Sequence, residues 1–308
     1  MAVSCSGLSL KNITTFIINP VANKGRAAKN ADLLRHAVEL LGDAVAYSSD
    51  YAGHAPEIAR RSMDQSRAVI ACGGDGTAHE IANVLAFSDV SLGILPTGSA
   101  NDFVKSLDHR FGRDYPADAY LRANSQLVDL GRVKAEGQLQ RYFLNSFGMG
   151  FTGRIARKVR NTRWLKGEMI YLNALLSVLL GYKPPKMHIK LITPDVPIEI
   201  DEPVFAFSVG NGRIEGGKFH IAPEAEINDG LLDVCILKAV SKARFFGYVW
   251  KYMRGTQIFD SRVIYSKVHA IELDLQEPEV MHMDGEVFEG ICGKIRIEAV
   301  PASIKVLC

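Results

Sequence analysis

The stretch Val69-Ile70-Ala71-Cys72-Gly73-Gly74-Asp75-Gly76-Thr77 decides how the rest of the chain is interpreted. An apolar run ends at glycines, a carboxylate and a hydroxyl, and apolar residues three to four positions apart follow, which predicts a buried strand, a tight turn and a helix start. Glycine backbones let N–H groups approach an anion, and a helix N-terminus adds partial positive charge, so this turn suits nucleotide phosphates. Asp75 would then serve a metal, a proton or a ribose hydroxyl. The alternative is a plain strand-to-helix connection with Asp75 as a turn or cap residue.

Strand and helix patterns alternate through the first 125 residues. The expected strands cover 14–19, 44–47, 69–72 and 92–95, and the expected helices cover 31–41, 54–63 and a segment that ends at Ala86. This alternation predicts an α/β domain whose parallel sheet is covered on both faces. Two successive strands end in glycine-containing polar loops that carry Asp75 and Asp102, and neighbouring strand ends would place these loops side by side.

The loop after the first strand is a further candidate. It begins at Asn19-Pro20 and continues through Lys24 and Arg26. Ligands of α/β folds bind at the carboxyl ends of strands, so Asn19, Lys24 and Arg26 would face a phosphate there. A simple strand-to-helix loop remains the alternative.

From about Gln126 the sequence changes character. Short β-branched and aromatic runs separated by turns predict a mostly antiparallel, β-rich sandwich. The strand-like runs cover 127–133, 141–147, 187–192, 204–209, 231–237, 263–264, 271–275 and 294–297. A last strand-like run, Pro301 to Leu307, is expected to return to the first domain.

The segment Phe151–Tyr182 interrupts the strand pattern. Its first part is basic and contains Trp164, and its second part, from Met169, is apolar. A basic segment beside an apolar helix would rest on an anionic bilayer surface. The alternative is a solvated helix followed by a core helix. The basic residues are Arg154, Arg157, Lys158, Arg160, Arg163 and Lys166.

Composition excludes several classes of protein. The 308 residues favour about two domains, and the net charge of +2 argues against a nucleic-acid partner. The five cysteines lack zinc or redox spacing, which favours free thiols in a reducing cytoplasm. The N-terminus lacks a signal-peptide pattern. The longest apolar stretch, Met169–Tyr182, is shorter than the roughly 20 residues that span a bilayer.

Two late turns carry carboxylates. Asn228-Asp229-Gly230-Leu231-Leu232-Asp233 opens a strand, and Asp284-Gly285-Glu286 lies near the end of the chain. A carboxylate with turned backbone carbonyls is able to hold Mg²⁺ or Ca²⁺. Ordinary Asp-Gly turns are the alternative for both.

Taken together, these segments resemble the diacylglycerol kinase catalytic-domain family, which includes soluble YegS-like bacterial lipid kinases and the sphingosine and ceramide kinases. NAD kinases share the first Gly-Gly-Asp-Gly-Thr, so the resemblance to this family depends on the later motifs. The matching pieces follow the family's order over nearly the whole chain: Asn19-Pro20, Gly73–Thr77, Gly98–Phe103, Asp229–Asp233 and Asp284–Glu286.

The resemblance implies a two-domain architecture with an active site in the cleft between the domains. A nucleotide-binding α/β domain would cover 1–125 and be completed by the strand 300–308, and a β-rich lipid-substrate domain would cover 126–299. ATP would lie against Asn19, Ser49, Gly73, Gly74, Asp75, Gly76, Thr77, His79, Gly98 and Ser99.

The resemblance also implies roles for the carboxylates. Glu286 would take the proton from the lipid hydroxyl. Asp75 and Asp102 would bind a catalytic Mg²⁺ or act through it. A second, structural Mg²⁺ would bind Asp229 and the backbone carbonyls of Glu226 and Leu231. Two positions depart from the family pattern. His79 replaces the usual Asn and leaves the contact with the nucleotide in doubt, whereas Ser99 replaces a frequent Thr and keeps the hydroxyl.

The resulting expectation is an ATP-dependent lipid kinase that phosphorylates a primary hydroxyl of a lipid such as diacylglycerol. Other lipids (a sphingoid base, ceramide or phosphatidylglycerol) and a soluble substrate such as NAD remain open. A non-catalytic lipid-binding protein with a kinase-like fold is the alternative from a different class. We expect a cytoplasmic protein that contacts the membrane peripherally during catalysis. The sequence leaves a homodimer open.

Overall fold

The structure is a computed structural model that describes residues 12–22, 28–107, 116–162 and 168–308. The chain divides into two compact units. The first unit contains residues 1–98, 110–126 and 304–308, and the second contains 99–109 and 127–303. The loop that carries Asp102 therefore belongs to the second unit, and the last five residues return to the first.

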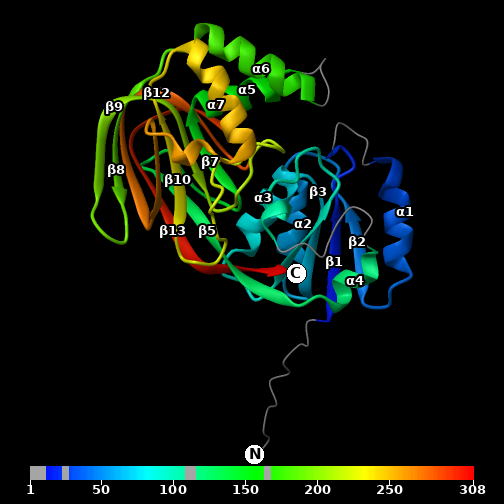
Figure 1. Cartoon of the computed structure of the whole chain (residues 1–308). Coiled ribbons are helices and arrows are strands. Elements are labelled where there is room, and N and C mark those ends of the chain that lie inside the picture. Colours follow the sequence, from blue (N-terminus) through cyan, green and yellow to red (C-terminus); the bar gives the residue numbers. More distant parts are fainter. Residues whose placement is uncertain (1–11, 23–27, 108–115, 163–167) are drawn as a thin grey trace, which may run out of the picture. The chain divides into compact units, whose positions relative to one another are not determined.

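The first unit is a parallel α/β fold (Figure 1). Its strands lie in the order β4-β3-β1-β2, with the end of β13 parallel to β4 through the pair Val306 and Leu92. The central strand β3 is buried on both faces, which explains its almost uninterrupted apolar sequence. The elements are β1 (Ile13–Ile18), α1 (Ala28–Glu39), β2 (Ala44–Ser48), α2 (His54–Ser62), β3 (Ser66–Gly73), α3 (Asp75–Leu85), β4 (Ser91–Pro96) and α4 (Ala117–Arg122).

Helices pack on this sheet through residues at helical spacing. On α3, the side chains of Ala78, Ile81, Ala82 and Leu85 are buried, three to four positions apart. Residues of α1 and the ring of Tyr120 on α4 join the strand side chains in one core cluster. The pattern of alternating strand and helix predicted for this part of the chain is confirmed.

The second unit is built on antiparallel strands. The order β11-β10-β9-β7-β12-β13 forms its main path, β8 pairs with β9 and β12, and β5 pairs with β6 and β13. The elements are β5 (Ser125–Ala135), β6 (Leu139–Phe143), β7 (Ser146–Gly150), α5 (Phe151–Asn161), α6 (Glu168–Gly181), β8 (Lys186–Ile192), β9 (Ile198–Gly210), β10 (Leu232–Lys238), α7 (Lys242–Arg254), β11 (Val263–Val268), β12 (Ala270–Met283) and β13 (Glu286–Leu307), with short 3₁₀ helices at Phe103–Ser106 and Gln257–Phe259.

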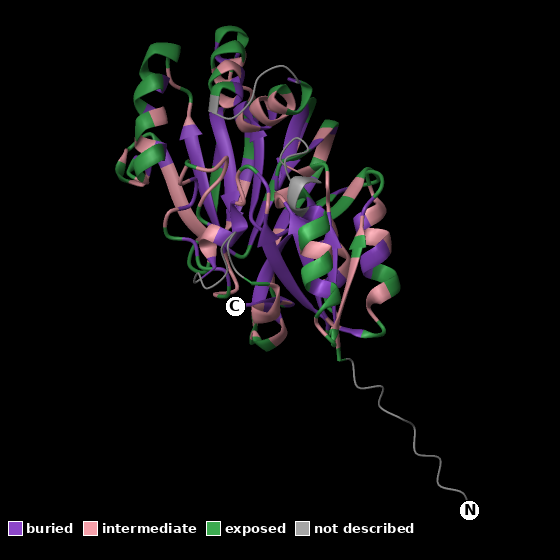
Figure 2. Ribbon diagram, turned by 90° about the vertical axis from the view of Figure 1, so that its right-hand side faces the viewer, coloured by how far each residue is buried: buried purple, intermediate pink, exposed green. Residues whose placement is uncertain are grey.

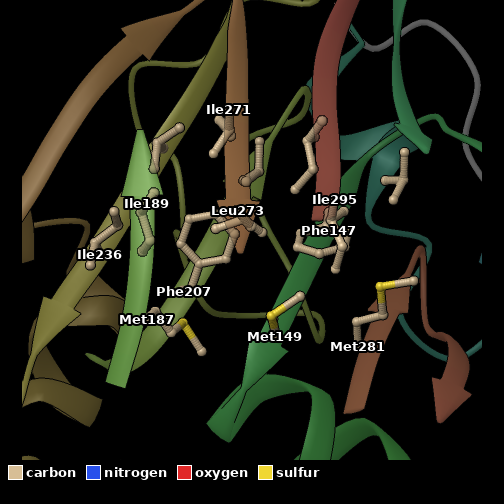
Figure 3. Packing of buried hydrophobic residues seen from close by; sticks show 14 of the residues in the cluster. Phe147, Met149, Met187, Ile189, Phe207, Ile236, Ile271, Leu273, Met281 and Ile295 are labelled. Carbon is tan, nitrogen blue, oxygen red and sulfur yellow. The ribbon is translucent and has the colours of Figure 1, made fainter. Parts of the chain in front are cut away.

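The core of this unit is aromatic and aliphatic. Phe147 and Phe207 from neighbouring strands meet edge to face with ring centroids 6.0 Å apart (Figure 3). Inward side chains of β8, β12 and β13 complete the cluster, and the strands are accordingly the most buried part of the unit (Figure 2). The expected β-rich second domain is confirmed.

Two details of the second half differ from the sequence prediction. The run 141–147 is two strands, β6 and β7, because the N–H groups of Leu144 and Asn145 leave the ladder and bind the carboxylate of Asp284. Residues Lys242–Arg254 form a helix, α7, that the strand-rich pattern did not predict. Its buried side chains, Phe245, Tyr248 and Tyr252, have helical spacing and are the signal for it.

Helix α5 packs on β12 so closely that one position admits only glycine. A Cβ added at Gly153 would lie 2.1 Å from the carbonyl oxygen of Val280. We expect Gly153→Ala to lower the free energy of unfolding by about 2–3 kcal/mol, because backbone cannot yield as a side chain does. Gly247→Ala on α7 is the control: nothing lies within 4 Å of its added Cβ, and it should stabilise by about 0.5–1 kcal/mol. Equal urea midpoints for the two variants would contradict this close packing.

Candidate active site

Two glycine turns of the first unit touch each other. The turn after β3 and the turn after β4 are joined by hydrogen bonds from the backbone N–H groups of Thr97 and Gly98 to the carbonyl oxygen of Gly73, at 2.9 and 3.1 Å. A Cβ added at Gly74 would lie 3.2 Å from the Cα of Gly98. Backbone therefore meets backbone here, as expected for loops at neighbouring strand ends.

The loop after β1 is tied to the same place. Asn19 Nδ2 donates a hydrogen bond to Thr77 Oγ1 at 2.9 Å, and a Cβ at Gly73 would lie 2.4 Å from that oxygen. Ser49 lies at the end of β2, where its N–H donates to the carbonyl of Ile18 at 2.8 Å. Asn19, Ser49, Gly73 and Thr77 therefore follow the carboxyl ends of β1, β2 and β3. Lys24 and Arg26 lie outside the described residues.

The N-terminus of α3 completes this group. Gly74 is the N-cap of this helix, so no side chain caps the first N–H groups at this position. Asp75 follows it in the first turn. The first N–H groups of a helix have no partner within it and attract anions. Gly76 is exposed, and His79 is buried on the next turn, where Asn83 Nδ2 donates to its carbonyl oxygen at 3.0 Å.

Asp102 is clamped within the second unit. Its Oδ1 accepts hydrogen bonds from Lys105 Nζ at 3.1 Å and from the N–H of Gly217 at 2.8 Å. Lys105 Nζ also donates to the carbonyl oxygen of Gly217 at 3.0 Å. An ammonium and a backbone N–H that bind the same carboxylate oxygen hold this buried side chain in one orientation. Ser99, at the start of this loop, is exposed.

The turn Asp284-Gly285 presents Glu286. Both turn residues have positive φ, 49° and 85°, the geometry of a two-residue hairpin that favours Asp-Gly. The buried Asp284 carboxylate accepts three hydrogen bonds of 2.7–2.8 Å from the N–H groups of Leu144, Asn145 and Ser146. Glu286 is exposed and begins β13 opposite Met283. The fixed turn thus carries an outward carboxylate.

The loop 211–219 joins the Asp102 clamp to the Asp284 turn. Its Gly217 binds Asp102, and its Ile214 carbonyl accepts a hydrogen bond from Asn145 Nδ2 at 2.9 Å. Glu215 Oε1 lies 3.3 Å from Nε2 of the buried His282, two residues before Asp284. Sequence reasoning missed this loop. The consecutive glycines 216 and 217, both with positive φ, were the available signal.

In the turn around Asp229, the carboxylate is paired with a lysine side chain. Lys267 Nζ lies 2.5 Å from Asp229 Oδ2, and the N–H of Leu231 donates to Oδ1 at 3.0 Å. The same ammonium lies 3.9 Å from Oδ2 of the buried Asp233. Glu226 is exposed. Lys267 thus pairs with the one carboxylate of the predicted set, as Lys105 does with Asp102, and a divalent ion at Asp229 stays a prediction.

The basic residues of α5 are largely engaged with β12 and β13. Arg154 pairs with Glu279 at 2.9 Å, and Arg157 and Arg160 pair with Glu289 at 3.2 and 2.7 Å. Lys158 and Arg160 are nevertheless exposed, so the outer face of this helix remains in contact with solvent. Arg163, Trp164 and Lys166 lie outside the described residues.

Comparisons with known proteins give the family. The domain described as "Diacylglycerol kinase catalytic domain" matches residues 14–133, and the "YegS C-terminal NAD kinase beta sandwich-like domain" matches residues 145–308. A protein named "Diacylglycerol kinase" from Bacillus subtilis is 30% identical over 82% of this chain and 78% of its own length. The chain belongs to the diacylglycerol kinase family of lipid kinases.

More distant members of this lipid kinase family align over almost the full length. A "Diacylglycerol kinase" of Mycobacterium tuberculosis is 26% identical over 95% of this chain and 94% of its own. The crystal structure of a diacylglycerol kinase from Bacillus anthracis Sterne has the same fold, with a TM-score of 0.70 at 20% identity over 96% of both chains.

Membership of the family implies the use of ATP. The turn after β3 fits this substrate, because it ends at the N-terminus of α3, which attracts anions such as the phosphates of ATP. Among the described residues, no cluster of three or more His, Cys, Asp and Glu is arranged to hold a metal ion. No helix in that part of the kinase has the length and apolarity to cross a membrane.

The Glu215–His282 pair gives this kinase a predicted pH dependence. Burial lowers the pKa of His282, but the carboxylate of Glu215 outweighs it, so the pKa is raised above its ordinary value. The folded state then binds the proton more tightly, so this contribution to stability is complete below about pH 6.5 and is lost as the pH rises through the raised pKa. We expect the free energy of unfolding to fall over that range in the wild type.

Two variants test the origin of this pH dependence. Glu215→Gln should remove most of it, because the imidazolium then loses the carboxylate that raises the pKa of His282 most and keeps only the smaller contribution of Asp284. His269→Gln, at an exposed histidine between β11 and β12, should leave the profile unchanged. Parallel urea-stability profiles for the wild type and Glu215→Gln between pH 6 and 9 would refute the assignment.

Proposed function

We propose that this chain transfers the γ-phosphate of ATP to the primary hydroxyl of a lipid such as diacylglycerol. The observation that supports the proposal is the Asp284-Gly285 turn, which three backbone N–H groups hold and which the exposed Glu286 follows directly. An alcohol has a very high pKa, so a carboxylate positioned beside it assists attack on phosphorus. Glu286 is our candidate for this base.

The remaining residues bind and orient the substrates. Backbone N–H groups of the turns at Gly73–Thr77 and Gly98 would receive the phosphates of ATP, with Asn19 fixing the hydroxyl of Thr77 beside them. Asp75 and Asp102 have the oxygen donors that Mg²⁺ prefers, and the ion bound with ATP would offset the negative charge of the transferred phosphate. Lys105 keeps Asp102 in one orientation.

A lipid acceptor is favoured over a soluble one such as NAD. The apolar helix α6 exposes several of its side chains, which suits contact with the membrane that presents a lipid. Among lipids, diacylglycerol, a sphingoid base, ceramide and phosphatidylglycerol all offer a hydroxyl near a headgroup. A protein that binds lipid without transferring phosphate would have little need for the fixed turn that presents Glu286.

The test is phosphoryl transfer from γ-labelled ATP with Mg²⁺ in separate reactions. Detergent micelles would carry diacylglycerol, ceramide, sphingosine or phosphatidylglycerol, and one reaction would contain NAD alone. We expect label in a lipid, most strongly in phosphatidate. Label in NAD would overturn the lipid assignment, and ATP left intact in every reaction would overturn the kinase proposal.

A further inference from the structure

Helix α6 is apolar on both of its faces, but only one face is covered. Ile170, Ala174 and Leu179 are buried in the second unit. The opposite face exposes Met169, Leu172, Leu176 and Leu180, of which Leu180 is 79% exposed. These four recur at intervals of three and four residues and form one stripe along the helix. A stripe of this kind is unusual on a protein surface unless it binds something.

Helix α7 repeats the arrangement. Its inner side chains are buried, whereas Phe246, Trp250 and Met253 are exposed at intervals of four and three residues. Arg254 lies over the ring of Trp250, 4.5 Å from the centroid. A large aromatic side chain with a polar tip and a cation beside it is characteristic of residues at the water–membrane boundary.

The two stripes meet end to end. Lys242, at the start of α7, donates a hydrogen bond from Nζ to the carbonyl oxygen of Leu180, near the end of α6. Lys242, Phe246 and Trp250 follow one another at intervals of four residues and so share one face of α7. The outer face of α7 therefore begins where that of α6 ends. We call the combined surface the apolar row: Met169, Leu172, Leu176, Leu180, Phe246, Trp250 and Met253.

The charged residues of the helices α5 and α7 are all basic, and Arg154, Arg157, Arg160 and Lys251 among them pair with carboxylates of other elements. Helix α5 carries four Arg or Lys residues and α7 carries four, and neither contains Asp or Glu. A cavity of about 220 Å³ lies between α5 and α6 and is lined by Arg157, Lys158 and Tyr182. Arg154 also lines it, and its Nε is buried without a hydrogen-bond partner in the described part of the chain. The cavity thus offers donors for a phosphate beside apolar side chains.

We infer that the apolar row inserts into an anionic lipid bilayer, with the α5–α6 cavity receiving a lipid phosphate. Basic residues around an apolar helical face are the composition of interfacial membrane helices. A second copy of this chain fits less well, because it would bring the two sets of basic side chains together. This inference rests on the proposed function in one respect, that a lipid substrate is presented by a membrane.

The experiment uses Trp250 as its reporter. The chain has two tryptophans, so Trp164→Phe leaves Trp250 as the single tryptophan of the full-length protein. With vesicles of equal parts phosphatidylglycerol and phosphatidylcholine, without ATP, we expect a blue shift of its emission and sedimentation with the vesicles. Vesicles of phosphatidylcholine alone should bind at least tenfold more weakly. Inorganic phosphate should compete poorly, because it lacks the acyl chains that the apolar row would cover.

Paired variants in the same background locate the surface. Leu176→Ser with Leu180→Ser should weaken vesicle binding at least tenfold. Val196→Ser is the control, since Val196 is 74% exposed in the β8–β9 turn at the other end of the unit (Figure 1). Circular dichroism should show both proteins folded. Equal vesicle binding by the two, or unchanged Trp250 emission on bound vesicles, would overturn the inference.

Two further outcomes distinguish membrane insertion from self-association and from the proposed kinase activity. A lipid-free dimer in the wild type that Leu176→Ser with Leu180→Ser converts to a monomer would assign the apolar row to a second copy and overturn the membrane role. Vesicle binding without phosphoryl transfer in detergent micelles would support the inference while removing the proposed kinase activity. Transfer in micelles by the double serine variant, with vesicle binding lost, would support both.

Discussion

Replacing Glu286 by glutamine is expected to lower kcat for lipid phosphorylation by about 10²- to 10⁴-fold, the usual contribution of a general base. Glutamine has almost the same shape but accepts a proton far less readily than a carboxylate. Glu286 is exposed at the start of β13, so the substitution should change the free energy of unfolding by less than about 0.5 kcal/mol. ATP affinity, measured by equilibrium dialysis, should remain within about threefold of the wild type.

The control for this substitution lies three residues further along the same strand. Glu289 pairs with Arg157 and Arg160 at the surface, and exposed ion pairs of this kind contribute little to stability. Glu289→Gln should therefore keep most of the activity in detergent micelles. If the two glutamine variants lost activity equally, a general loss of negative charge on this hairpin would explain the result, and Glu286 would not be the base.

The fold of the first unit could be predicted because its signals are local. Strand β3 is buried on both faces, and its sequence is accordingly an apolar run. In the helix after Gly74, the apolar residues recur at helical spacing within a few residues. Helix α7 was missed because its aromatic residues also favour strands, and they lie in a region where strands dominate. The break between β6 and β7 was missed because its cause, Asp284, lies 140 residues from Leu144 along the chain.

In the candidate site, too, local features could be predicted from the sequence and contacts between distant residues could not. Glycines and carboxylates in short motifs identified the turns at Asp75, Asp102 and Asp284 from sequence alone. Some of the groups that hold those turns come from distant segments: Asp102 is bound by the neighbouring Lys105 and also by Gly217, which lies 115 residues away. The Lys267 ammonium on Asp229 is another such case. An ordinary lysine in a strand gives no sign of its partner 38 residues earlier.

Asp284→Ala is expected to lower the free energy of unfolding by about 4 kcal/mol, the largest stability effect predicted for this chain. The substitution leaves three buried N–H groups without an acceptor, and each such loss costs roughly 1–3 kcal/mol. Alanine also tolerates the positive φ at this position poorly, at a further cost of about 1 kcal/mol. Asp195→Ala, at an exposed aspartate in the β8–β9 turn, should change stability by less than about 0.5 kcal/mol in the same urea titration.

Asp284→Asn separates the charge of the side chain from its shape. Asparagine accepts positive φ in an Asn-Gly turn and retains one oxygen for the N–H groups, so we expect a loss of only about 1–2 kcal/mol. Its kcat should still fall by about 10²-fold, because Glu286 depends on this turn for its position and small misplacements are costly in phosphoryl transfer. In Glu286→Gln, by contrast, activity should fall without any loss of stability. A stable, fully active Asp284→Asn protein would mean that the hairpin holds Glu286 without the buried carboxylate.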